Sequence, residues 1–128
     1  MSGIYDITRT EILEGYLGAA LFLESDPETE TSLADTYATR DFTPEARDAA
    51  VADVESFLAS SSPADFRLAA EQLGASRFGS DLWYDRPGSG VGLFDEHLGE
   101  AGDRLSAVAR GLGTAHVFPD GHGKVYFA

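Results

Sequence analysis

The sequence predicts an α+β protein in which N-terminal helices pack on a small antiparallel sheet, in the order α-α-α-β-β-α-β-β. Apolar residues recur at helical spacing as far as Leu73, and short alternating segments then flank glycine-containing turns. The chain has 128 residues, of which 43% are hydrophobic, and it has no cysteine. We therefore expect one domain over residues 1–128 that is held by its core, without disulfides or a zinc ribbon.

The first helix is expected from about Thr8 to Glu24. Thr8 and Glu11 have the spacing of a capping box, in which each side chain accepts from a free backbone N–H group. The segment is apolar nearly all round, which predicts a central, buried helix. Gly15 and Gly18 lower its helix propensity but permit another element to pack closely.

Residues 25–42 are predicted to form a long connection. Glu28 and Glu30 alternate with threonine, so in an extended chain both carboxylates face the same way, about 6.6 Å apart. Three apolar residues are expected to anchor this connection to the core: Leu33, Tyr37 and Phe42.

A second helix is predicted to start at Thr43, with Pro44 at the first helical position. Its apolar residues repeat at helical spacing: Ala46, Ala50, Val54, Phe57 and Leu58. A run of serines and a proline then ends it, and Ser62 is expected to cap a short third helix that ends at Gly74.

The first predicted hairpin has strands over residues 76–86 and 91–94, joined by the turn at 87–90. Alternation with polar residues indicates the first strand, through Phe78, Leu82 and Tyr84. The turn contains proline and two glycines.

A fourth helix is predicted over 96–111, followed by a second hairpin with strands at 115–118 and 125–127. The turn at 120–123, Asp-Gly-His-Gly, is interpreted as a hairpin turn. A phosphate-binding loop would lead into a helix, whereas a strand follows here.

The charge is strongly negative and uneven. The chain has 22 acidic and 9 basic residues, a formal charge of −13. Residues 1–71 hold 15 acids and 4 bases, and residues 72–128 hold 7 and 5. This excess disfavours binding to DNA, RNA or anionic lipid, and it favours a basic partner or a salty environment. We expect the C-terminal arginines to pair with nearby acids: Arg77, Arg86, Arg104 and Arg110 with Asp81, Asp85, Asp95 and Asp103.

No motif indicates an enzyme, a metal site or a cofactor. The three histidines, His97, His116 and His122, do not share the spacing of a helical zinc site. An enzyme assembled in space from groups such as His97, His116 and Asp81 stays an alternative. The longest apolar run, residues 16–23, is too short for a membrane span, and no secretory leader is evident. We expect a cytoplasmic protein.

Residues 79–95, GSDLWYDRPGSGVGLFD, followed by Leu98-Gly99 and the spaced Gly102 and Leu105, resemble a family of small acidic proteins of bacterial viruses and prophages. The family pattern is roughly GHDFWLTRNGHGAGFWD, then LGxxGxxL, and a final DDGK-[IV]-Y hairpin. Ser80 and Ser89 stand where the family has histidines, so this chain cannot use any chemistry that those histidines supply. This favours the interpretation of the segment as a structural hairpin.

Such virus-encoded sets include inhibitors of CRISPR–Cas surveillance complexes, and acidic ones are proposed to imitate DNA. The resemblance implies a non-enzymatic inhibitor in the host cytoplasm that binds the basic DNA-binding surface of a host defence complex. The acids expected to form this surface are Asp26, Glu28, Glu30, Asp41, Glu45, Asp48 and Glu55. The alternative is an accessory protein whose acidity is an adaptation to salt and which binds another protein through an apolar patch around Trp83 and Tyr84.

Overall fold

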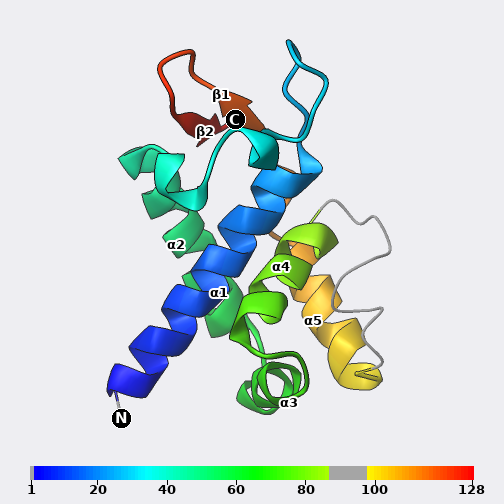
Figure 1. Cartoon of the computed structure of the whole chain (residues 1–128). Coiled ribbons are helices and arrows are strands. Elements are labelled where there is room, and N and C mark those ends of the chain that lie inside the picture. The colour runs from blue at the N-terminus through cyan, green and yellow to red at the C-terminus, as the bar shows by residue number, and fades with distance from the viewer. Residues whose placement is uncertain (1, 87–97) are drawn as a thin grey trace.

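The structure is a computed structural model that describes the backbone of residues 2–86 and 98–128, and the side chains of these ranges from Arg9 onward. Within them the chain is mostly helical with one two-stranded antiparallel sheet, which is consistent with the α+β class (Figure 1). The elements are α1 (Ser2–Leu23), the short 3₁₀ helices η1 (Leu33–Asp35) and η2 (Thr39–Asp41), α2 (Pro44–Ser60), α3 (Pro63–Leu73), α4 (Ala75–Asp85), α5 (Glu100–Arg110), β1 (Val117–Pro119) and β2 (Val125–Phe127).

Helix α1 is the central element, as its apolar composition predicts, and it contacts α2 and α4. It begins at Ser2, so Thr8 lies inside the helix and does not cap it, contrary to the predicted capping box. Its buried side chains form much of the core: Ile12, Tyr16, Leu17, Ala19, Ala20 and Leu21. None of the described helices combines the length and the apolar character that crossing a bilayer requires.

The crossing of α1 and α4 is the most extensive contact between two helices. It is close because two glycines face the partner backbone. A Cβ atom on Gly15 would lie 2.0 Å from the Ser76 carbonyl oxygen, and one on Gly79 would lie 1.9 Å from that of Ile12. The Ser80 hydroxyl also donates to the Gly15 carbonyl at 3.1 Å. The predicted packing role of Gly15 is confirmed, whereas the nearest atom to a Cβ on Gly18 is a Thr39 methyl at 4.0 Å.

The predicted strand over residues 76–86 is wrong, because this segment forms α4 and the turn after it. Phe78 and Leu82 alternate with polar residues, but they are also four residues apart and so share one face of a helix. Trp83 is out of phase with that alternation and is nevertheless buried. The second strand of that predicted hairpin, 91–94, lies outside the described residues.

The predicted second and third helices are confirmed. The Thr43 hydroxyl accepts from the Ala46 N–H at the start of α2, and Pro44 is its first residue. Helix α3 ends at Leu73 before Gly74, whose φ of 80° suits glycine, although the Ser62 side chain makes no capping hydrogen bond. Helix α5 begins at Glu100, later than predicted.

The predicted second hairpin is confirmed. Val117 pairs with Phe127 and Pro119 with Val125 in antiparallel register. Its turn is held by the Asp120 carboxylate, which accepts backbone N–H groups of His122 and Lys124 at 2.7 and 3.1 Å and thereby has a lowered pKa.

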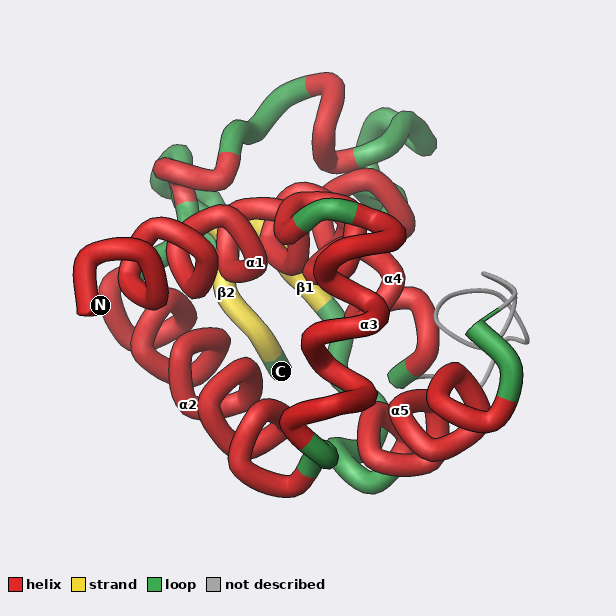
Figure 2. The backbone as a smooth tube through the Cα atoms, turned by 90° about the horizontal axis from the view of Figure 1, so that it is seen from below, coloured by secondary structure: helices red, strands yellow, loops and turns green. Residues whose placement is uncertain are grey.

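The hairpin closes one end of the helical layer and does not underlie all the helices (Figure 1). Seen from the opposite end, its strands lie behind the helices (Figure 2). Phe127 stacks on Phe42 at 5.1 Å between ring centroids and lies 5.6 Å from the Trp83 ring. The Thr43 N–H also donates to the Val125 carbonyl, so β2 is fixed to the start of α2.

The glycine crossing makes a direct prediction. Gly79→Ala places a methyl group on a backbone carbonyl that cannot rotate away, so α1 and α4 must separate. We expect the free energy of unfolding to fall by about 2 kcal/mol or more. Gly18→Ala is the control on α1, the other helix of the crossing, where a Cβ has room, and better helix propensity should stabilise the protein by up to about 1 kcal/mol. Urea unfolding followed by circular dichroism measures the stability of both variants. Equal changes in the free energy of unfolding would contradict the close approach of α1 and α4 at Gly79.

Candidate functional site

The acidic loop after α1 is a tight turn. The Asp26 carboxylate accepts from the Glu28 N–H at 2.9 Å, and the Asp26 carbonyl accepts from the Glu30 N–H at 2.8 Å. Glu30 has a φ of 59°, in the left-handed region. The extended arrangement predicted for Glu28 and Glu30 is therefore wrong. Asp26, predicted as a surface acid, is only 8% exposed.

Two more of the seven predicted surface acids make internal contacts. The Asp41 carboxylate accepts from the Ala38 N–H at 2.9 Å and so holds η2. Glu55 forms an ion pair with Arg9 at 2.9 Å between α2 and α1. Both carboxylates therefore contribute to the fold.

The other four predicted acids, Glu28, Glu30, Glu45 and Asp48, are exposed. In residues 2–86 and 98–128, no cation lies within ion-pair distance of any of them. The loop bearing the first two and the start of α2 bearing the others lie beside the β-hairpin, at the same end of the molecule (Figure 1).

We call this region the hairpin end: the loop at residues 26–30, the hairpin at 117–127 and the first turns of α2. Two exposed cations, Arg40 and Lys124, belong to neighbouring segments. The hairpin end is therefore mixed in sign, with an excess of carboxylates.

A groove of about 330 Å³ opens at the hairpin end. We call it the hairpin groove, and its lining residues are Asp26, Pro27, Glu28, Tyr37, Phe118, Pro119, Gly121 and Tyr126. Phe118 and Tyr126 are paired across the strands, with ring centroids 6.0 Å apart, and are about 40% and 39% exposed. The sequence interpretation missed these two rings. The alternation of side chains along a strand could have found them. Val117 and Val125 are buried, and the next residue of each strand, Phe118 or Tyr126, is exposed.

The apolar surface patch predicted around Trp83 and Tyr84 is not found, because neither side chain is exposed. Trp83 is 3% exposed and packs edge-on against Tyr16, with centroids 5.2 Å apart. Tyr84 is partly buried against the core. An apolar contact with a partner would have to use other residues.

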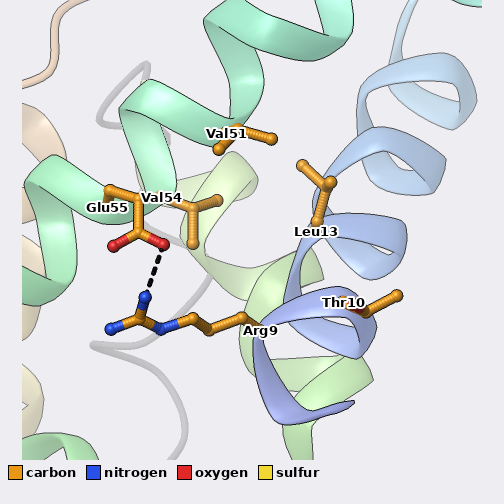
Figure 3. Close-up of a pocket in the computed structure, with 6 residues that line it drawn as sticks. All are labelled: Arg9, Thr10, Leu13, Val51, Val54 and Glu55. Carbon is orange, nitrogen blue, oxygen red and sulfur yellow. Dashed lines mark hydrogen bonds and ion pairs between the residues drawn. The ribbon is translucent and has the colours of Figure 1, made fainter. Parts of the chain in front are cut away.

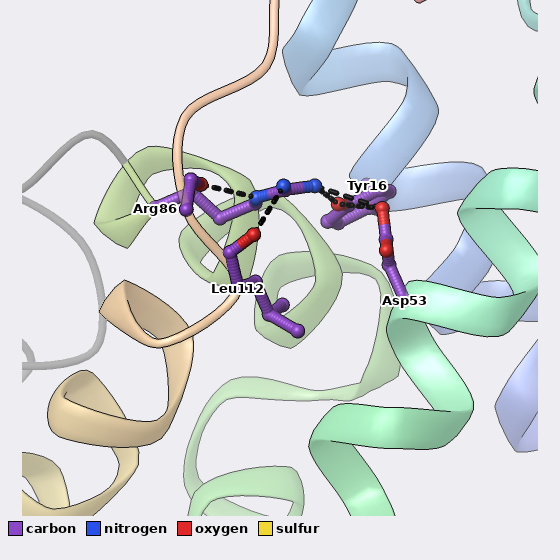
Figure 4. Close-up of polar contacts among 5 residues, drawn as sticks. Tyr16, Asp53, Arg86 and Leu112 are labelled. Atoms are coloured by element: carbon purple, nitrogen blue, oxygen red, sulfur yellow. Dashed lines mark hydrogen bonds and ion pairs between the residues drawn. The ribbon is translucent and has the colours of Figure 1, made fainter.

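A buried arginine joins four segments (Figure 4). The Arg86 guanidinium donates to the Asp53 carboxylate at 2.8 Å and to the Tyr16 hydroxyl. It also donates to the carbonyls of Leu112 and Gly113, each at 2.9 Å. Arg86 therefore pairs with Asp53 of α2, and the prediction that it pairs with a nearby acid is wrong.

This arginine cluster is structural in character. Burial raises the pKa of Tyr16 well above its ordinary value, and the nearby Arg86 charge only partly opposes this. Tyr16 also donates to Asp53 at 3.1 Å. The phenol therefore stays protonated at neutral pH and is not poised as a base.

Another ion pair joins α3 to α5. Arg104 donates to both carboxylate oxygens of Asp65, at 2.7 and 2.8 Å. These hydrogen bonds lower the Asp65 pKa. Arg104 thus pairs with a distant acid, whereas the predicted pairing of Arg77 with Asp81 is found at 3.8 Å.

A second groove, of about 260 Å³, lies between α1 and α2 (Figure 3). Leu13, Val51 and Val54 line it, and the ion pair of Arg9 with Glu55 bridges one end. Among its described lining residues the charged ones, Arg9 and Glu55, neutralise each other, so they offer little chemistry for a ligand.

The described residues contain no group of three side chains arranged to hold a metal ion. His116, a member of the enzyme alternative, contacts Glu24 at 2.9 Å, while Asp81 has Arg77 beside it. His97 lies outside the described residues. In the described part of the chain, His116 and Asp81 thus contact different residues.

Arg86 should be essential for stability. Arg86→Met leaves Asp53 without its cation and two carbonyls without a donor, so we expect a loss of about 3 kcal/mol or more in the free energy of unfolding. Arg9→Met breaks the exposed pair with Glu55 and should cost less than about 1 kcal/mol. Chemical denaturation measures the free energy of unfolding of both variants. A loss for Arg86→Met as small as the one expected for Arg9→Met would show that the cluster is dispensable.

Asp65 should contribute to acid sensitivity. Its pKa is lowered in the folded protein, so its stabilising effect is complete above its ordinary value of 3.8 and is lost as the pH falls through the lower, folded value. Asp65→Asn should be less stable than the wild type at neutral pH, with a difference that shrinks in acid. Thermal unfolding against pH measures this, with the exposed Asp103→Asn as control. Parallel curves for Asp65→Asn and the wild type would contradict it.

Comparison of the chain with protein-family models, with curated proteins and with solved structures gives no match.

Proposed function

We propose that this chain is a non-enzymatic, phage-encoded inhibitor of a host defence system in the host cytoplasm. It occupies the basic DNA-binding surface of a defence complex, of which CRISPR–Cas surveillance complexes are the favoured class, and thereby blocks DNA binding. The observation that carries the proposal is a set of exposed carboxylates at the hairpin end that form no ion pair with a cation of the described residues: Glu28, Glu30, Glu45 and Asp48.

The backbone that carries these carboxylates is ordered before binding. Glu45 and Asp48 are three residues apart on α2, which places their side chains on neighbouring positions of one helical face. The Asp26 turn fixes the backbone that carries Glu28 and Glu30. Ordered charges lose less conformational entropy on binding than flexible ones do, which favours a rigid imitation of phosphates.

The net charge of −13 also favours fast association with a basic surface. Electrostatic attraction between oppositely charged surfaces steers the encounter, and added salt weakens it. Binding by this route should therefore decrease as ionic strength rises, and target DNA should compete for the same surface.

A second candidate is an accessory module that binds another protein through apolar contacts. The exposed Phe22, at 63%, and the exposed Phe118 favour it. In this case the acidity would be an adaptation to salt, and binding should hold steady or strengthen with added salt.

Charge removal at the hairpin end tests the first proposal. A variant with Glu28→Gln, Glu30→Gln, Glu45→Gln and Asp48→Asn should bind a DNA-free surveillance complex about tenfold or more weakly, because each exposed charge contributes a modest attraction. The measurement is binding at low and moderate salt, with target DNA as competitor.

The matched control removes four exposed acids elsewhere: Glu11→Gln, Glu71→Gln, Glu100→Gln and Asp103→Asn. Both variants lose four negative charges from −13, which leaves −9, so net charge alone cannot distinguish them. A control that binds as weakly as the test variant would indicate nonspecific attraction. Absence of binding to several complex types would favour the accessory module.

A further inference from the structure

We propose that the hairpin groove binds an arginine side chain of the partner protein. This inference rests on the proposed function, because it names the group on the basic partner surface that the chain recognises. The groove combines carboxylates of the loop, Asp26 and Glu28, with exposed aromatic rings of the hairpin, Phe118 and Tyr126.

The aromatic side chains provide one half of an arginine site. Phe118 and Tyr126 are held side by side by strand pairing, with their rings tilted by 37°. Tyr37, anchored to the core after η1, also lines the groove. A planar guanidinium stacks on such rings and is attracted to their faces, while its methylene stem covers apolar surface.

Asp26 provides the other half. It is more than nine-tenths buried, yet it lines the groove. One carboxylate oxygen accepts from the Glu28 N–H, and the other, Oδ2, has no hydrogen bond to the described residues. A carboxylate that is fixed in this way and has one oxygen without a donor is suited to a charge-assisted hydrogen bond from a cation.

Arginine fits this combination better than lysine or an anion. Its guanidinium can contact a ring face and donate to carboxylates in the same plane, whereas a lysine ammonium is a strongly hydrated point charge. Phosphates are excluded by the carboxylates of Asp26 and Glu28, because like charges repel. The volume of the groove, about 330 Å³, is near the lower end of the range of volumes of ligand-binding pockets. It therefore suits a small ligand such as one side chain.

The test uses short blocked peptides as probes: acetyl-Gly-Arg-Gly-amide and its lysine and citrulline counterparts. Titration into the isotopically labelled full chain should shift amide resonances of residues 26, 28, 37, 118 and 120–126. The lysine peptide should bind about fivefold more weakly, and the uncharged citrulline peptide should not produce saturable shifts. Shifts spread evenly over the acidic surface, or equal for arginine and lysine, would overturn the inference.

Two groove variants make the test specific. Phe118→Thr with Tyr126→Thr keeps residues that favour strands but removes both rings, and Glu28→Gln removes one charge. Each should weaken arginine-peptide binding by at least about threefold. The controls on α3, Leu68→Ala and Glu71→Gln, change a similarly exposed apolar residue and a similar charge away from the groove, and should bind like the wild type.

The outcomes separate this inference from the proposed function. If the groove variants inhibit a surveillance complex as well as the wild type does, the arginine site is wrong while the proposed function stands. If the arginine peptide binds as expected but the chain binds no defence complex, the arginine site stands while the proposed function is wrong.

Discussion

The close crossing of α1 and α4 is the constraint on which the rest of the structure depends. At Gly15 and Gly79 the two backbones approach so closely that a carbonyl oxygen lies where a side chain would begin. This contact sets the position of α4, and with it the place where Trp83 meets Tyr16 and where the chain leaves the helix at Arg86. Arg86 can then reach Asp53 on α2 and the carbonyls before β1. A backbone contact between two helices thus determines how the other elements are joined.

The use of arginines in ion pairs between elements also affects the charge of the surface. The chain has 9 basic residues against 22 acidic ones, and several arginines are used in ion pairs between elements. Arg86, Arg104 and Arg47 each bind a carboxylate from another helix. These pairs join α1 to α2, the end of α4 to α2, and α3 to α5, and they leave fewer cations for the surface. The excess of carboxylates at the hairpin end follows from this distribution, since no cation of the described residues lies within ion-pair distance of its four exposed acids.

Much of the fold could be predicted from local signals. The caps of α2 and α3 and the turn of the second hairpin depend on residues adjacent in the chain, such as Thr43, Gly74 and Asp120. The segment at 76–86 could not be assigned in this way, because Phe78 and Leu82 fit both a strand and a helix, and the contact with Gly15 that decides between them is distant in sequence. The acidic surface was predicted in part. Asp26, Asp41 and Glu55 have partners or burial that composition cannot reveal, while Glu28, Glu30, Glu45 and Asp48 are exposed.

The hairpin end combines two kinds of recognition that have different physical consequences. Carboxylates attract any basic surface over the distance that salt permits, so they give speed without much selectivity. Aromatic rings act only in contact, and they distinguish a planar guanidinium from other cations. Because Glu28 belongs both to the exposed acids and to the lining of the hairpin groove, the same loop can attract a partner and position one of its side chains. If the groove binds arginine as we propose, it supplies a selectivity that charge cannot give, because charge alone does not select one basic partner from many.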